Sequence, residues 1–163
     1  MTKLDNGERE ALRHGIARSD KWPAVEKAHK LLEPVCQCCG NEQAAVQVHH
    51  IFPFHYCIAL GRPDLELDHR NLISLCETEK GRPSQNHHLL IGHLDDFKSS
   101  NINVVRDARE IYKNRMSAFI QNSDTWKTEK QNRLKLLDEM SADEKAAFRK
   151  SMDDTYPVIL NEL

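Results

Sequence analysis

The segment Cys36-Gln37-Cys38-Cys39-Gly40 opens a window of the sequence that ends at His93, and this window decides the fold. All 5 cysteines and 7 of the 9 histidines lie in it. Its later parts are His49-His50-Ile51, then Asn71-Leu72-Ile73-Ser74-Leu75-Cys76, then Asn86-His87-His88. The window therefore supplies one complete set of soft metal ligands and, separately, one His/Asn/His set.

The composition predicts a small intracellular domain. A chain of 163 residues with 39% hydrophobic residues is expected to form one domain with a small core, which gains stability from a bound metal. Polar sequence follows Met1 directly, so we expect no secretory signal. An odd number of cysteines then favours metal-bound thiolates in a reducing compartment over disulfides. No apolar run is long enough for a membrane span.

The charge balance argues mildly against nucleic acid as a partner. Lys and Arg number 23 against 25 Asp and Glu, so the basic character typical of nucleic-acid-binding domains is missing. Bound divalent ions add positive charge locally, and local clusters matter more than the sum. Several basic residues do lie close to the window in sequence: Arg62, Arg70, Lys80, Arg82, Lys98, Arg106 and Arg109.

Local patterns predict two strands and several helices. Apolar spacing predicts a helix over residues 23–33, with Pro23 near its start and Pro34 at its end. Alternation over residues 45–49 and the apolar run 72–75 predict strands, separated by an extended loop. Further helices are expected over residues 85–93, from residue 104 to 119, around Trp126 to Met140, and from Ser141 onward. Asn103 is the expected cap of the helix that begins at residue 104.

A structural zinc site is predicted at the cysteine turn. Tetrahedral zinc commonly takes Cys₄ or Cys₃His ligands, and a Cys-x-x-Cys turn followed by glycine presents two thiolates to one ion. The complete ligand set is Cys36, Cys39, Cys76 and His87. Cys38 and Cys57 are expected not to bind the ion. The alternatives are ordinary buried cysteines, or a redox motif, for which the surrounding βαβ pattern is missing.

The second set suits metal-assisted hydrolysis of a phosphodiester. This reaction needs a base that activates water and a cation that stabilises the developing charge. In a strand, His49 and His50 point to opposite faces, which favours one ligand and one base. Asn71 can hold the base, or the loop that carries it, through its amide. The alternative interpretation of the histidine pair is a partly exposed strand end.

These residues resemble the HNH nuclease family. The shared pattern covers about residues 18 to 112, and the family name corresponds to His50, Asn71 and His88 here. The resemblance implies an α+β fold: a small ββα-metal core with structural zinc, flanked by N- and C-terminal helices. The expected divisions are an N-terminal helical arm over residues 1–33, the nuclease core over 34–103, and a C-terminal helical extension over 104–163.

By similarity, His50 would be the general base and Asn71 would orient it. His49 and His88 would bind the catalytic ion, while Cys36, Cys39 and Cys76 would bind the structural zinc. Many relatives have Cys-His where this chain has His87-His88, so we interpret His87 as replacing that cysteine.

His93 departs from the family spacing. Relatives often carry a second histidine four residues after the helix histidine, whereas His93 follows His88 by five. On an α-helix these two side chains point about 140° apart, so a shared ion requires the helix to end near Gly92. We name His93 as a candidate ligand of the catalytic ion; a phosphate contact or a structural role are the alternatives. His55 has no assigned role, and His14, His29 and His69 are expected at the surface.

The expected function is a metal-dependent HNH endonuclease that hydrolyses DNA by nicking or double-strand cleavage. The catalytic ion can be Mg²⁺, Mn²⁺, Ni²⁺ or Zn²⁺. The expected partners are DNA and, as for short phage-type relatives, a phage terminase or another packaging or processing protein. The alternative function is a zinc-stabilised DNA- or protein-binding module without cleavage activity.

Overall fold

The computed structural model describes residues 19–40, 45–54, 57, 63–77, 86–97 and 99–139, with residues 141, 143 and 147. The described chain combines a small two-stranded sheet with helices, so the expected α+β class is confirmed at this level. Its α-helices and strands are α2 (Trp22–Leu32), β1 (Val46–His50), β2 (Leu72–Cys76), α4 (Val104–Arg106), α5 (Ser117–Gln121) and α6 (Asp124–Glu139). Shorter helical turns are η1 (Pro63–Glu66), η2 (His69–Asn71), η3 (His88–Gly92) and η4 (Asp107–Ile111).

The two strands form an antiparallel pair in which His49 lies opposite Ile73 and His50 opposite Leu72. The two predicted strands are therefore confirmed within one residue at each end. Every residue of β2 is buried because helical segments cover both faces of the sheet, which is why its sequence is continuously apolar around Ser74. Strand alternation places the His49 and His50 side chains on opposite faces.

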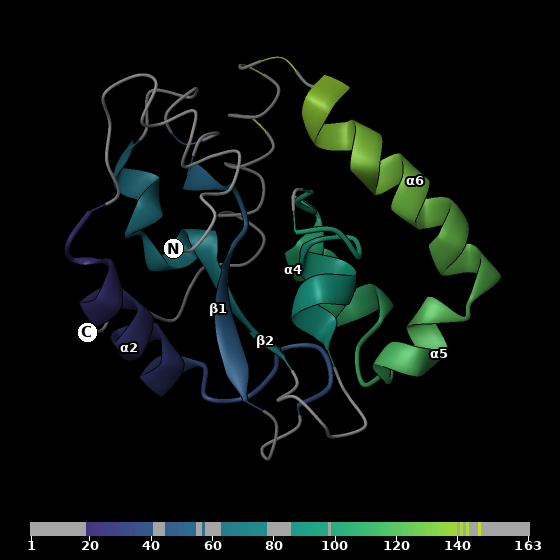
Figure 1. The fold of residues 1–163 in the computed structure, drawn as a ribbon, viewed down its shortest axis with the longest axis horizontal. Helices are drawn as coiled ribbons and strands as arrows, with labels where there is room; N and C mark the ends of the chain where they lie inside the picture. Colours follow the sequence, from purple (N-terminus) through teal and green to yellow (C-terminus); the bar gives the residue numbers. More distant parts are fainter. Residues whose placement is uncertain are drawn as a thin grey trace, which may run out of the picture.

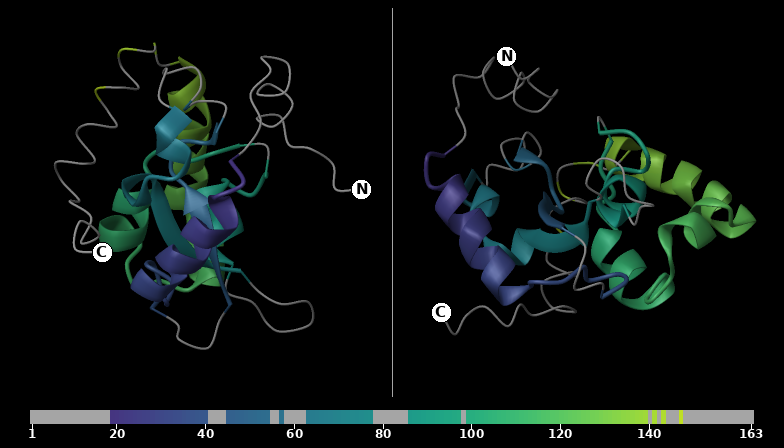
Figure 2. Two further views of the ribbon diagram at one scale, coloured as in Figure 1. Left: turned by 90° about the vertical axis from the view of Figure 1, so that its left-hand side faces the viewer. Right: turned by 60° about the horizontal axis from the view of Figure 1, so that its bottom comes forward.

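Helix α2 lies on one side of the sheet, and α4, α5 and α6 lie on the other (Figure 1). The same arrangement is visible from two further directions in Figure 2. Pro23 occupies the first turn of α2, where its missing N–H costs nothing, and the helix ends before Pro34. The Trp22 ring packs on the His50 ring with 4.4 Å between centroids.

The continuous helix expected from residue 104 to 119 is wrong. Helix α4 passes directly into the π-helical turn η4, and the chain leaves helical geometry at Tyr112. The Tyr112 ring is buried against Trp126 of α6, and Asn114, with φ of 62°, reverses the chain so that its N–H donates to the Cys38 carbonyl. Tertiary contacts therefore override the helical spacing, and α5 starts a new helix.

Two other helix expectations can be compared with the structure. Helix α6 confirms the helix expected around Trp126, whereas most of the segment from Ser141 onward lies outside the described residues. Asn103 precedes α4 but its side chain does not cap it; the amide contacts Asp107 instead. Within the described ranges, every helix is too short or too polar to cross a bilayer.

The main core fills the space between the sheet and the C-terminal helices. Its fully buried members include Ile73, Leu75, Ile91, Val104, Ile120 and Trp126. The core therefore connects β2, the η3 turn and α6, which are the elements that surround the candidate site.

Candidate metal centres

The first candidate centre is the Cys/His cluster formed by Cys36, Cys39, Cys76 and His87. One potential ligand atom from each residue lies within 4.8 Å of those of the others. Cys39 Sγ is 4.0 Å from Cys76 Sγ, and Cys76 Sγ is 3.1 Å from His87 Nδ1. Sulfur atoms bound to one tetrahedral zinc are about 3.8 Å apart, given a Zn–S bond of about 2.3 Å. The cluster can therefore hold a metal such as zinc.

Three chain segments build the Cys/His cluster. The Gly40 N–H donates to the Cys36 carbonyl at 2.8 Å, and Gly40 has φ of 67°, so this turn needs a residue that tolerates left-handed geometry. Cys76 ends β2, and His87 directly precedes η3. The His87 Nε2–H donates to the Arg115 carbonyl at 2.8 Å, which directs Nδ1 at the sulfur atoms.

Electrostatics in the Cys/His cluster favour a cation. Hydrogen bonds from the Cys39 and Cys76 thiols lower the pKa of Cys36 far below its usual range, whereas sharing its proton with Cys36 and Cys39 raises the pKa of Cys76. Burial disfavours the charged form of His87, but hydrogen bonds with the cysteines outweigh it and raise the pKa of His87 to about 12. The negative charge of the Cys36 thiolate is thus balanced by protonated His87, and a divalent metal ion that displaced the shared protons would take over this role.

The second candidate centre is the histidine cluster formed by His49, His88 and His93, which also has one ligand atom per residue within 4.8 Å of the others. The Nε2 atoms of His88 and His93 are 3.1 Å apart. His49 Nε2 is buried and finds no hydrogen-bond partner among the described residues. Three convergent imidazole nitrogens, one of them unsatisfied, are what a bound cation requires.

Neighbouring groups orient the histidine cluster. The His93 Nδ1–H donates to the Ser99 carbonyl at 2.8 Å, which places the lone pair of the neutral ring on Nε2. A Glu77 carboxylate oxygen lies 3.6 Å from His88 Nδ1. Burial, reinforced by the charge of His93, lowers the pKa of His88 to about 3 and that of His49 well below its usual range. Both rings are therefore neutral at physiological pH, which is the form that binds metals.

The five-residue spacing between His88 and His93 is accommodated by a π-helical turn. In η3 the His93 N–H donates to the carbonyl of His88, five residues earlier, at 3.1 Å. This wider turn adds one residue relative to an α-turn, and it brings onto one face two side chains that an α-helix would separate. The turn ends at Gly92, where a shared ion was expected to require the helix to end, but it is π-helical and not α-helical. Single π-turns are frequent at functional sites.

Gly92 leaves room for the His49 ring. A Cβ at residue 92 would lie 3.3 Å from Cε1 and Nδ1 of His49 and 3.3 Å from Cδ1 of Leu75. These contacts are closer than ordinary carbon packing at about 3.5–4.0 Å. The glycine therefore allows η3 to approach β1 closely enough for all three histidines to meet.

His50 and Asn71 lie outside the histidine cluster. The His50 Nε2–H donates to the Glu66 carbonyl at 2.9 Å, so the basic lone pair of the neutral ring is on Nδ1. The fully buried Asn71 amide donates to the carbonyls of Phe52 and Leu65 and accepts from the Phe52 N–H. Asn71 thus fixes the chain on both sides of the His50 ring.

The two clusters differ in the number of ligands that they offer to an ion. The Cys/His cluster offers four ligands, the closed set typical of structural zinc, whereas the histidine cluster offers three among the described residues, the open set typical of catalytic ions. Cys38 and Cys57 lie outside both clusters; their thiols donate to the Tyr112 and Phe52 carbonyls. These placements agree with their prediction as non-ligands.

The expectation that His29 lies at the surface is wrong. His29 is fully buried on the inner side of α2, where its ring bonds Glu33 at 2.8 Å and faces His69 Nδ1 at 3.2 Å. The helix can bury this polar side chain because Glu33 supplies an acceptor and is itself paired with Arg109. His69 is half-buried, and His14 and His55 lie outside the described residues.

Several supporting groups were not found from the sequence. Glu77 and the Ser99 carbonyl act on the histidine cluster through contacts that only the folded chain brings together, and the sequence indicated Gly92 as a helix end but not its close approach to His49. The departure from the usual four-residue histidine spacing, with a glycine before the second histidine, was the one available signal.

No protein-family model, curated protein or solved structure matches this chain.

Proposed function

We propose that this protein is a metal-dependent endonuclease of the HNH type, which hydrolyses DNA phosphodiester bonds. The observation that carries the proposal is the open set of three imidazole nitrogens from His49, His88 and His93, built beside a closed Cys/His cluster. A closed structural centre explains how a small core is stabilised, but it does not explain a second group of neutral, inward-pointing histidines.

The proposed core is a ββα-metal unit. Strand β1 supplies both His49 and the neighbouring base, β2 pairs with it, and the η3 turn takes the place of the metal-binding helix. A divalent ion held by His49, His88 and His93 would supply the positive charge that stabilises the phosphoryl transition state. The zinc-type Cys/His cluster would anchor both the end of β2 and the start of η3.

His50 is the proposed general base. Its Nε2 proton is engaged by the Glu66 carbonyl, so Nδ1 is the nitrogen that would take a proton from the attacking water. Asn71 would keep this ring in place by holding the Phe52 and Leu65 backbone, a positioning role. The strand geometry supports the division between a ligand, His49, and a base, His50.

DNA is the proposed substrate, and a phage terminase or another packaging protein is the proposed partner, both on the strength of the family resemblance. The thiolates of the Cys/His cluster require a reducing environment, which supports an intracellular location. The second candidate function is a zinc-stabilised binding module that does not cut. The net charge of −2 favours it, because an autonomous nuclease usually presents a basic surface to its substrate.

Supercoiled plasmid separates the two functions. Purified protein is incubated with Mg²⁺, Mn²⁺, Ni²⁺, Zn²⁺ or EDTA, beside His50→Ala, His88→Ala and the exposed-site control Arg106→Ala. We expect nicking or linearisation by the wild type and the control only with a divalent ion. His50→Ala should keep the second equivalent of metal but lose cleavage, whereas His88→Ala should lose both. If the wild type binds zinc and stays folded but does not cleave the plasmid with any of these ions, the result would favour the binding module.

A further inference from the structure

The end of the η3 turn is held by Asn101, a residue that belongs to neither cluster. The backbone N–H of Asn101 donates to the Gly92 carbonyl at 2.9 Å, and its side-chain Nδ2 donates to the Ile91 carbonyl at 2.9 Å. These two carbonyls belong to the last turn of η3, where no later helical N–H is available to them. Asn101 therefore fixes the segment that ends immediately before His93.

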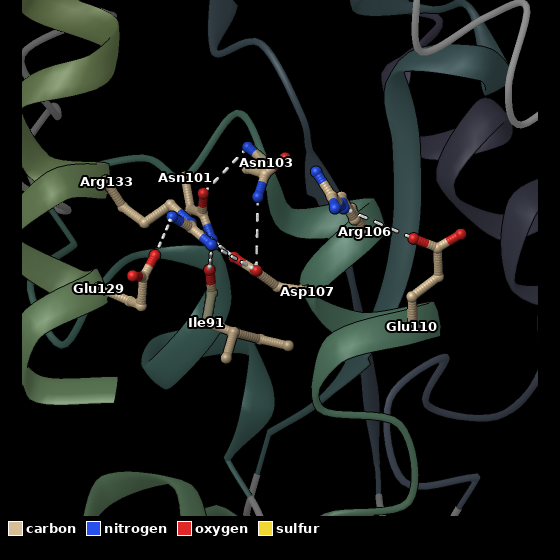
Figure 3. Close-up of polar contacts among 8 residues, drawn as sticks. All are labelled: Ile91, Asn101, Asn103, Arg106, Asp107, Glu110, Glu129 and Arg133. Atoms are coloured by element: carbon tan, nitrogen blue, oxygen red, sulfur yellow. Dashed lines mark hydrogen bonds and ion pairs between the residues drawn. The ribbon is translucent and has the colours of Figure 1, made fainter. Parts of the chain in front are cut away.

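Asn101 is itself held by a buried ion pair. Its Nδ2 donates to Asp107 Oδ2 at 2.7 Å, and Asp107 is fully buried. From α6, Arg133 donates to both carboxylate oxygens of Asp107, through Nε at 3.0 Å and Nη2 at 2.9 Å (Figure 3). This two-point contact fixes the orientation of the carboxylate as well as its position. We name the chain of contacts Asn101–Asp107–Arg133 the clamp.

The segment beyond η3 needs outside support. Leu94 and Asp95 both have left-handed backbone geometry, with φ of 56° and 65°, which is unfavourable for side chains other than glycine. Such conformations persist only where the surroundings enforce them. Helix α6 supplies a second contact here, since Lys130 Nζ lies 3.3 Å from Asp95 Oδ2. The left-handed pair directly follows His93, so relaxation of this segment would move that ligand.

We propose that Asn101, Asp107 and Arg133 are positioning residues for the histidine cluster, so that helix α6 completes the metal centre. A buried ion pair is seldom needed for stability, because well-packed apolar residues often serve equally well. Here the buried ion pair offers geometric specificity, because the end of η3 must hold the His88 and His93 side chains close together. The inference rests on the proposed function in one respect: the histidine cluster must bind an ion.

The experiment measures the two centres separately in the full-length chain. Protein loaded with one equivalent of Zn²⁺ is titrated with Ni²⁺ by calorimetry, because Ni²⁺ suits imidazole ligands. The variants are Arg133→Ala, Arg133→Lys, and the double change Asp107→Leu with Arg133→Met, which removes both charges at similar volume. The matched control is Arg106→Ala, which breaks an exposed pair with Glu110 on the same helical segment (Figure 3).

We expect Arg133→Ala and the double variant to weaken Ni²⁺ binding by about 10- to 100-fold while retaining one equivalent of zinc. Arg133→Lys should fall between these variants and the wild type, since lysine keeps the charge but not the two-point contact. Arg106→Ala should bind like the wild type. Folded variants that bind Ni²⁺ within twofold of the wild type would overturn the clamp, as would equal weakening of both centres. A wild type that takes up no Ni²⁺ would instead refute the ion site itself.

Discussion

Replacement of Gly92 by alanine should damage the histidine cluster more than the fold. The added Cβ would lie 3.3 Å from two atoms of the His49 ring and from Leu75 Cδ1, so the ring must move by a few tenths of an ångström. Alanine gains about 0.5–1 kcal/mol over glycine within a helix. Overpacking of a core costs about 1–3 kcal/mol. The expected net loss of folding stability is therefore about 0–2.5 kcal/mol.

Gly92→Ala should also weaken the binding of the second ion at the histidine cluster. Metal–ligand distances tolerate deviations of only about 0.2 Å, which is less than the shift that the new methyl group requires of His49. We expect at least a tenfold loss of affinity for the second ion, or about 1.4 kcal/mol. Calorimetric titration of the zinc-loaded protein with Ni²⁺ measures this affinity, and urea unfolding measures the stability.

Gly40→Ala is the matched control for Gly92→Ala. Residue 40 has open space around its Cβ position but φ of 67°, so alanine there should cost about 1–2 kcal/mol through backbone strain alone. It lies at the Cys/His cluster, so once that cluster is saturated with zinc it should leave Ni²⁺ binding at the histidine cluster unchanged. If Gly92→Ala binds Ni²⁺ as tightly as the wild type, the close approach of η3 to His49 does not set the geometry of the site.

Three further changes test other parts of the structure. Cys76→Ser should abolish stoichiometric zinc binding and lower the free energy of unfolding by more than about 4 kcal/mol, as measured by metal analysis and urea unfolding; EDTA should have little further effect on this variant. Asn71→Ala removes three hydrogen bonds to buried backbone groups, and the Phe52 N–H loses its acceptor; this should cost about 3 kcal/mol in the same unfolding assay. Burial alone raises the pKa of Glu33, but the His29 hydrogen bond and the Arg109 charge outweigh it and lower that pKa below 4.5. The stability that ionised Glu33 contributes is therefore present above pH 4.5 and lost as the pH falls through its lowered pKa, so the advantage of the wild type over Glu33→Gln should shrink in that acid range.

The sequence allowed prediction of the strands and of the Cys36–Cys39 pair because these depend on short-range rules, whereas Cys76 and His87 were assigned as the more distant Cys and His residues that complete a tetrahedral set. Alternation at His49 and the apolar run before Cys76 place the strand pair, and the thiolate spacing of the Cys36–Cys39 turn matches zinc geometry. The convergence of His88 with His93 was only partly predictable. On an α-helix, side chains five residues apart point in different directions, and neither histidine by itself indicates that the chain forms a π-turn here.

The remaining features depend on contacts between segments far apart in the chain. His29 was expected at the surface, yet Glu33 and the sheet provide a buried polar environment for it. Tyr112 interrupts a predicted helix because Trp126, 14 residues later, receives its ring. The connection of Arg133 to the end of η3 likewise requires the fold, since nothing in the local sequence of α6 indicates which carboxylate it will bind.

His87 and His88 are consecutive residues that belong to different clusters, so one peptide bond connects the two candidate centres. An ion in the Cys/His cluster fixes His87 and with it the start of η3, which sets the direction of His88. Occupancy of the two centres should therefore be thermodynamically linked, and each ion should raise the affinity for the other by the same factor. Loading would then be ordered, with the tighter-binding thiolate centre filled first. The availability of zinc would govern whether the histidine centre can take up its own ion.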